Sequence, residues 1–126
     1  MKIKSFTDLI VWKESHRLTI EIYKATEKFP SNEIFGITNQ IRRAAVSIPS
    51  NIAEGFGRIT TKDKKQFYII ARGSLIELQS QLLICRDLGY LNNKAFNELA
   101  TLTNNIHRLI NGFIKSTVEN KYVANK

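Results

Sequence analysis

The stretch QIRRAAVSIPSNIAEGFGR, residues 40–58, decides the fold of this chain. At helical spacing its apolar residues fall on one side and its polar residues on the other, which is the pattern of an amphipathic helix. Several of the apolar residues are small, so a neighbouring helix can approach this one closely. The apolar side consists of Ile41, Ala44, Ala45, Ile48, Ile52 and Phe56, and the polar side of Arg43, Ser47, Ser50 and Glu54.

A proline lies in the middle of this pattern. Pro49 has no backbone N–H, and its ring crowds the carbonyl group of Ala45, at a cost of about 3 kcal/mol in a helix interior. We therefore predict a kinked helix that is packed against neighbours. Ser47 and Ser50 flank the proline, and we expect their hydroxyl groups to satisfy backbone atoms that the kink leaves unpaired.

The same stretch resembles the signature of the four-helix bundle proteins named after open reading frames in 23S rRNA intervening sequences. These proteins are related to the accessory protein of diversity-generating retroelements. The similarity extends over nearly the whole chain, through the segments FTDLIVWKESHRL, FPSNEIFGI, ARGSLIELQSQL and LGYL. The resemblance implies a helical bundle that assembles into a five-fold ring, a homopentamer, and a role in binding nucleic acid. It implies no catalytic residues.

The remaining periodicity predicts three further helices and short connections. Thr7 or Asp8 is the expected cap of the first helix, and Gly89 the expected stop of the third. Such a chain folds as an all-α, antiparallel, up-down-up-down four-helix bundle, a single domain over residues 1–126. The tail is expected to be disordered or frayed from about residue 116. We predict helices over about residues 8–28, from 37 or 38 to 56, from 61 or 62 to 88, and from 93 or 94 to 115, with Thr60 or Thr61 as the cap of the third and Asn92 or Asn93 as the cap of the fourth.

Two of these helices have a second apolar side. In the first helix, one side holds Val11, Leu18, Ile22, Ala25 and Phe29, and the other holds Trp12, Thr19 and Tyr23. In the third helix, the inward side holds Phe67, Ala71, Ser74, Leu78, Gln81, Cys85 and Leu88, and a separate line holds Ile69, Ile76 and Leu83. The second sides are too apolar for solvent, and we expect them to contact a further helix or another subunit. The fourth helix buries Phe96, Leu99, Leu102, Ile106, Leu109, Ile110 and Phe113, and Thr103 interrupts this side.

Charge is distributed unevenly along the sequence. The chain of 126 residues is 43% hydrophobic and has a formal net charge of +8 at pH 7, of which residues 36–72 contribute seven basic and two acidic side chains. Such an excess suits phosphate binding, because neutralised phosphates release counterions. It also suits an anionic membrane surface or an acidic protein. No apolar run could span a membrane and no signal peptide is recognisable, so we expect a cytoplasmic protein without a membrane partner.

The basic residues are the best candidates for a functional site. We predict contacts with RNA or DNA, mainly with the phosphate backbone and with weak sequence selectivity. Tyr68 is the one aromatic residue of the basic stretch that we expect to point outward. The start of the third helix adds backbone N–H groups that favour phosphate. The predicted nucleic-acid-binding residues are Arg42, Arg43, Arg58, Lys62, Lys64, Lys65 and Arg72. For Arg42 and Arg43 a role in a subunit interface stays open.

Nothing in the sequence indicates an enzyme. His16 and His107 lack any metal-ligand spacing, Cys85 lies among apolar residues, and no glycine-rich phosphate loop is present. Neither a metal nor a cofactor is expected. Asn51 and Glu54 are expected to join a structural hydrogen-bond network with Arg43 or Arg58. The alternatives are an adaptor for an acidic protein, such as a reverse transcriptase, and a small nuclease that depends on one of the histidines.

Overall fold

The computed structural model describes the backbone of residues 2–124 and the side chains of residues 2–118. Part of the predicted frayed tail therefore lies outside the described residues. Within them the chain contains four α-helices, two short 3-10 helices and no strand, which confirms the all-helical prediction. The elements are η1 (Phe6–Asp8), α1 (Ile10–Thr26), η2 (Ser31–Glu33), α2 (Ile37–Phe56), α3 (Thr61–Asp87) and α4 (Asn93–Ala124). None of the described helices is long and apolar enough to cross a bilayer.

The first helix is shorter at both ends than predicted, because Asp8 closes a separate turn. The hydroxyl group of Ser5 accepts a hydrogen bond from the backbone of Thr7, and the Asp8 carboxylate accepts one from the Ser5 backbone at 3.1 Å. Leu9 is then extended, with φ −75° and ψ 128°, so that α1 begins only at Ile10. Backbone hydrogen bonds from Lys4 and Ser5 lower the pKa of Asp8.

The other helix boundaries agree better with the sequence. The hydroxyl group of Thr60 accepts a hydrogen bond from the backbone of Asp63 and caps α3, and the Asn92 side chain caps α4 in the same way. Gly89 follows α3 with φ +80°, a conformation that favours glycine. The backbone of α4 continues past residue 116 to Ala124, farther than the apolar pattern predicted.

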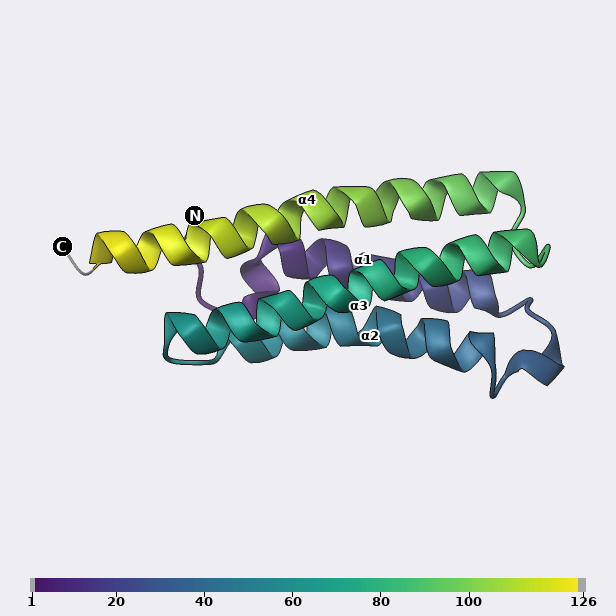
Figure 1. Cartoon of the computed structure of the whole chain (residues 1–126), viewed down its shortest axis with the longest axis horizontal. Helices are drawn as coiled ribbons and strands as arrows, with labels where there is room; N and C mark the ends of the chain where they lie inside the picture. The colour runs from purple at the N-terminus through teal and green to yellow at the C-terminus, as the bar shows by residue number, and fades with distance from the viewer. Residues whose placement is uncertain (1, 125–126) are drawn as a thin grey trace.

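The four helices lie side by side, with α2 packed against α1 and α3, and α4 packed against α1 and α3 (Figure 1). Hydrogen bonds connect neighbouring helices. From one bonded pair to the next along the bundle, residue numbers increase on one helix and decrease on its neighbour. One end of the molecule therefore contains the α2–α3 turn, the start of α1 and the end of α4 (Figure 1). The bonded pairs are Thr26 with Arg42, Thr19 with Ala45, Ser47 with Ser74, Phe56 with Lys64, Arg72 with Asn111, and Gln79 with Thr103 and Asn104.

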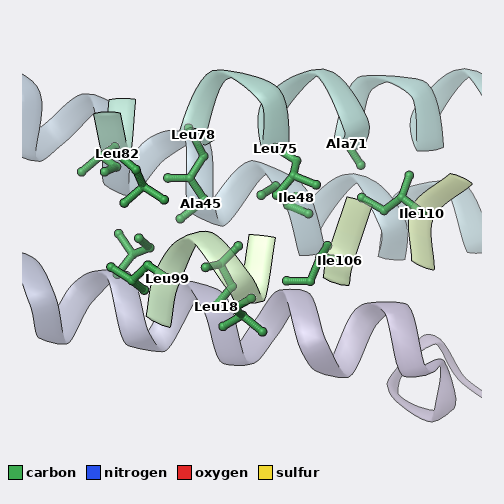
Figure 2. Packing of buried hydrophobic residues seen from close by; sticks show 14 of the residues in the cluster. Leu18, Ala45, Ile48, Ala71, Leu75, Leu78, Leu82, Leu99, Ile106 and Ile110 are labelled. Atoms are coloured by element: carbon green, nitrogen blue, oxygen red, sulfur yellow. The ribbon is translucent and has the colours of Figure 1, made fainter. Parts of the chain in front are cut away.

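The core runs the length of the bundle and receives side chains from all four helices (Figure 2). In α3 the buried side is wider than predicted, because this helix contacts both α2 and α4. Tyr68, Leu75 and Leu82 are buried there in addition to four of the predicted residues, Ala71, Leu78, Gln81 and Cys85. Phe67 and Ser74 are only half-buried, and Leu88 follows the helix and is half exposed. Thr103 is buried as well, and its hydroxyl group donates a hydrogen bond to the carbonyl of Ala100.

Pro49 is buried inside α2, and a residue from another helix satisfies the carbonyl group that it leaves free. The hydroxyl group of Thr19 on α1 donates to the carbonyl of Ala45 at 2.9 Å. The prediction that Ser47 and Ser50 do this was wrong, because the Ser47 hydroxyl bonds Ser74 and Asn51, and Ser50 is exposed. The reason is tertiary: the second side of α1 faces α2, which places Thr19 beside the proline.

Helices α2 and α3 approach each other closely at Gly55. A Cβ atom there would lie 2.6 Å from Cε1 of Tyr68 and 2.9 Å from Cβ of Phe67. Tyr68 is therefore buried at 1% exposure, packed against this glycine and, with ring centroids 4.6 Å apart, against Phe113. The prediction that Tyr68 points outward was wrong. Burial raises the pKa of Tyr68 to about 12.

The two second apolar sides have different surroundings. In α1, Thr19 bonds α2 and Tyr23 lies under the guanidinium group of Arg42, but Tyr23 is still 41% exposed, so α2 covers this side only in part. In α3, Ile69, Ile76 and Leu83 are 40%, 50% and 44% exposed. The line on α3 thus has no cover within the protomer among the described residues.

Candidate nucleic-acid interface

The α2–α3 turn, residues 57–60, and the start of α3 together carry the densest group of basic residues, Arg58, Lys62, Lys64 and Lys65, and local hydrogen bonds hold the turn in place. The backbone N–H groups of Gly57 and Arg58 donate to the carbonyls of Ala53 and Gly55. Lys64 donates through Nζ to the carbonyl of Phe56 at 2.7 Å and lies 5.3 Å from the centre of that ring. Partial burial lowers the pKa of Lys64. Lys64 therefore stabilises the end of α2 rather than reaching into solvent.

Arg58 is also engaged within the protomer. Its guanidinium group lies 4.6 Å from the centre of the Phe67 ring and 3.5 Å from the carboxylate of Glu54. Of the predicted hydrogen-bond network, only this ion pair between Glu54 and Arg58 is present, and both of its side chains are about half exposed. Asn51 belongs to a different group, since its amide donates to the carbonyl and hydroxyl of Ser47.

Two lysines at the start of α3 differ from Lys64 and Arg58. Lys62 and Lys65 are exposed and form no hydrogen bond or ion pair within the described residues. Their ammonium groups can therefore bind a ligand without breaking an existing contact. Arg72 lies seven residues, or two helical turns, after Lys65. Its guanidinium group donates a hydrogen bond to the side chain of Asn111 at 3.0 Å, at the surface of the bundle.

Arg42 and Arg43 lie far along α2 from this turn. Arg42 donates to the hydroxyl group of Thr26 at 2.8 Å and lies 4.7 Å from the centre of the Tyr23 ring. Arg43 lines an open cleft of about 380 Å³ between α2 and α3, together with Glu77. The fold therefore separates these two arginines from the other five predicted residues.

The fold also collects charges that are distant in sequence. We define the basic half as residues 2–18, 47–74 and 108–118, which share the end of the molecule that holds the α2–α3 turn, and the neutral half as residues 19–46 and 75–107 (Figure 1). The basic half contains eleven basic and four acidic side chains, and the neutral half six of each. Nearly all of the net charge thus lies in one half.

Sequence reasoning missed six basic residues of this half: Lys2, Lys4, Lys13, Arg17, Arg108 and Lys115. They lie in the first and last parts of the chain, far in sequence from residues 58–65. A signal was available, because the expected helix order places the start of the first helix and the end of the fourth beside the turn between the second and third. Counting charges by halves of each helix, instead of by segments of the chain, finds them.

Comparison with known proteins agrees with this fold. The family model described as 23S rRNA-intervening sequence protein matches residues 7–112. The chain belongs to this family. A crystal structure of a protein of unknown function from the S23 ribosomal protein family of Bacteroides thetaiotaomicron superposes with a TM-score of 0.78, at 20% sequence identity over 84% of this chain and 96% of that one. No curated protein matches the chain.

The three residues considered for catalysis have different surroundings in the fold. Cys85 is fully buried, and burial raises the pKa of its thiol to about 11. The ring of His16 stacks on Trp12 with centroids 4.9 Å apart, while His107 is half-buried on α4. Within the described residues, no group of histidine, cysteine and carboxylate side chains could hold a metal ion.

Proposed function

We propose that this 23S rRNA-intervening sequence protein binds structured RNA through its basic half, as a non-catalytic scaffold. The observation that carries the proposal is the separation of charge, with eleven basic against four acidic side chains in the basic half and none in excess in the neutral half. Folding does not require this separation, because the apolar core is continuous through both halves. A polyanion gains most from it through counterion release.

The binding is expected to depend on phosphates rather than on base sequence. Lys62 and Lys65 are exposed cations without partners in the described residues, and they suit phosphate oxygens. Tyr68 is buried and offers no stacking surface to bases. Arg58 and Lys64 support the turn from within, so their part in binding is indirect.

Self-association belongs to the same proposal. The exposed line Ile69, Ile76 and Leu83 on α3 suits contact with another copy of this antiparallel bundle. Lys65 and Arg72 lie on nearly the same side of α3 by helical spacing, so such contact would bring basic residues of several copies together. A five-fold ring is the assembly that the sequence resemblance implies. Repetition of a modest site around an axis multiplies its affinity through avidity.

The direct test measures binding of a fluorescent structured RNA by anisotropy over a series of salt concentrations. We expect binding that weakens steeply with salt, with a linear relation between the logarithms of affinity and salt concentration. Absence of binding at low salt would refute the RNA-binding function. Intact RNA after prolonged incubation is expected of a non-catalytic protein, whereas cleavage that His16→Ala or His107→Ala abolishes would support the nuclease alternative.

A second measurement tests assembly and partner class. Native mass spectrometry at low micromolar concentration should give a multiple of the 14.4 kDa chain mass. Ile76→Glu, in the middle of the exposed line, should then reduce the mass to that of one chain. The relation to retroelement accessory proteins suggests the alternative of an acidic protein partner such as a reverse transcriptase in the cytoplasm. Salt-sensitive binding to such a protein, with none to RNA, would favour that adaptor role.

A further inference from the structure

We propose that Ile59, at the tip of the α2–α3 turn, is an apolar wedge that packs against an unstacked base, so that the protein selects bulged or looped RNA over continuous duplex. This inference rests on the RNA-binding function proposed above and specifies the class of RNA. Ile59 is 96% exposed, the most exposed large apolar side chain among the described residues. Exposure alone would mean little, because single apolar residues are common on protein surfaces. Two further features distinguish Ile59: the turn that presents it is fixed by hydrogen bonds, and exposed lysines lie nearby in the sequence.

The turn that presents Ile59 is fixed from both sides. Before it, the backbone of Arg58 bonds the carbonyl of Gly55, and its side chain packs on Phe67. After it, Thr60 caps α3 through Asp63 at 3.1 Å. These contacts fix the backbone on both sides of Ile59, so the turn loses little backbone freedom when the side chain meets a partner.

The neighbouring charges indicate which partner fits. Lys62 and Lys65 follow Ile59 within two helical turns and are exposed without partners in the described residues. A nucleic acid presents phosphates beside flat apolar base faces, so that one short surface meets both the cations and the wedge. A second copy of this chain at the same place would bring lysines against lysines. A membrane would receive only one side chain from this turn.

Unstacked RNA is the form that an apolar wedge can enter most easily. Separating two stacked base pairs costs stacking free energy, whereas a bulged nucleotide is already unpaired. The grooves of continuous A-form RNA offer few apolar contacts, while bulges and loops expose base faces. The wedge should therefore add affinity at a bulge and none on a continuous duplex.

The experiment compares two hairpin RNAs of equal length, one continuous and one with a single-nucleotide bulge, by fluorescence anisotropy at one salt concentration. We expect the wild-type protein to bind the bulged hairpin about fivefold more tightly, the lower range for contact with one base. Ile59→Ala should abolish this preference and leave the affinity for the continuous hairpin unchanged. Phe35→Ala is the matched control, because Phe35 is 92% exposed but lies in the neutral half, and it should retain the preference. A 2-aminopurine at the bulge should change its fluorescence with the wild-type protein and not with Ile59→Ala.

The possible results separate the wedge from the function on which it rests. Equal preference for the bulge in the wild type and in Ile59→Ala would overturn the wedge and leave RNA binding standing. A change of oligomeric mass in Ile59→Ala would also overturn it, since the residue would then lie in a subunit contact. Loss of binding to anionic phosphatidylserine vesicles in this variant, with RNA binding intact, would assign Ile59 to a membrane. No binding of either hairpin by the wild type at low salt would refute RNA binding itself.

Discussion

The basic half and the neutral half of this bundle share one apolar core but differ in net charge, since the first contains eleven basic and four acidic side chains and the second six of each. Both halves contain local pairs: Arg58 lies 3.5 Å from Glu54 in the basic half, and in the neutral half Arg86 pairs with Asp87 at 2.9 Å. In the neutral half the Tyr90 hydroxyl group also donates to the Glu33 carboxylate at 2.8 Å, which raises the pKa of Tyr90. In the basic half, Lys62 and Lys65 stay unpaired within the described residues. Because unbalanced charge repels itself and opposes compaction, this difference supports the proposal that the basic half binds a polyanion.

The largest expected effect on stability comes from disrupting the contact between α2 and α3 at Gly55 in the basic half. Gly55→Ala adds a methyl group 2.6 Å from Cε1 of Tyr68, so α2 and α3 must move apart. We expect the free energy of unfolding to fall by about 1–3 kcal/mol, measured by urea denaturation. Gly73→Ala is the matched control, because nothing lies within 4 Å of its added methyl group and helix propensity favours alanine by about 0.5–1 kcal/mol. Equal stability of the two variants would show that the close approach is not required.

The next effect tests a contact at the boundary between the halves. Thr19→Val removes the hydroxyl group that donates to the Ala45 carbonyl, which Pro49 leaves without a helical partner. An unpaired buried carbonyl should cost about 1–2 kcal/mol in the free energy of unfolding, and Thr19→Ser should retain most of the stability. In a Pro49→Ala background the backbone regains an N–H group, so the cost of Thr19→Val should shrink. An unchanged cost there would contradict the proposed compensation.

A charge substitution tests whether RNA affinity depends on the position of the basic residues or only on net charge. Replacing Lys62 and Lys65 together by glutamine should weaken RNA binding about fivefold and reduce the slope of log affinity against log salt by about 2, one unit for each phosphate that is no longer neutralised. Replacing Lys24 and Lys28 of the neutral half by glutamine makes the same change in net charge. If both double variants weaken binding equally, net charge and not its position determines affinity.

The smallest effect concerns pH. The pKa of Asp8 is lowered because its carboxylate accepts backbone hydrogen bonds from Lys4 and Ser5. The carboxylate therefore stabilises the folded state above its ordinary pKa of 3.8, and this contribution is lost as the pH falls through the lowered value. Asp8→Asn should lower the melting temperature slightly at pH 7, and the difference from the wild type should disappear at acidic pH. A constant difference would show that the cap does not depend on charge.

The helices and most of the core could be predicted from the sequence, because they depend on periodicity and on local caps such as Thr60 and Gly89. The wrong predictions concern residues on helices that pack against two neighbouring helices. The partner of the Ala45 carbonyl was assigned to Ser47 and Ser50, which are near in sequence, although Thr19 on another helix provides it. Among the predicted site residues, sequence could not separate Lys64, which bonds the Phe56 carbonyl, from its neighbours Lys62 and Lys65. The local sequence pattern does not predict which way a long, flexible side chain such as lysine points.

The sequence by itself determined that this chain is helical, where its four helices lie and that it is strongly basic, since propensity, apolar spacing and composition are properties of the chain. Only the tertiary structure decided that Gly55 brings α2 against Tyr68 and that Ile59 stands outward near exposed lysines, whereas the gathering of charge in one half also follows from the expected order of the helices. The physical reason is distance. Coulombic, packing and hydrogen-bond energies depend on separation in space, and the bundle brings residues 2–18, 47–74 and 108–118 together only after the helices pack.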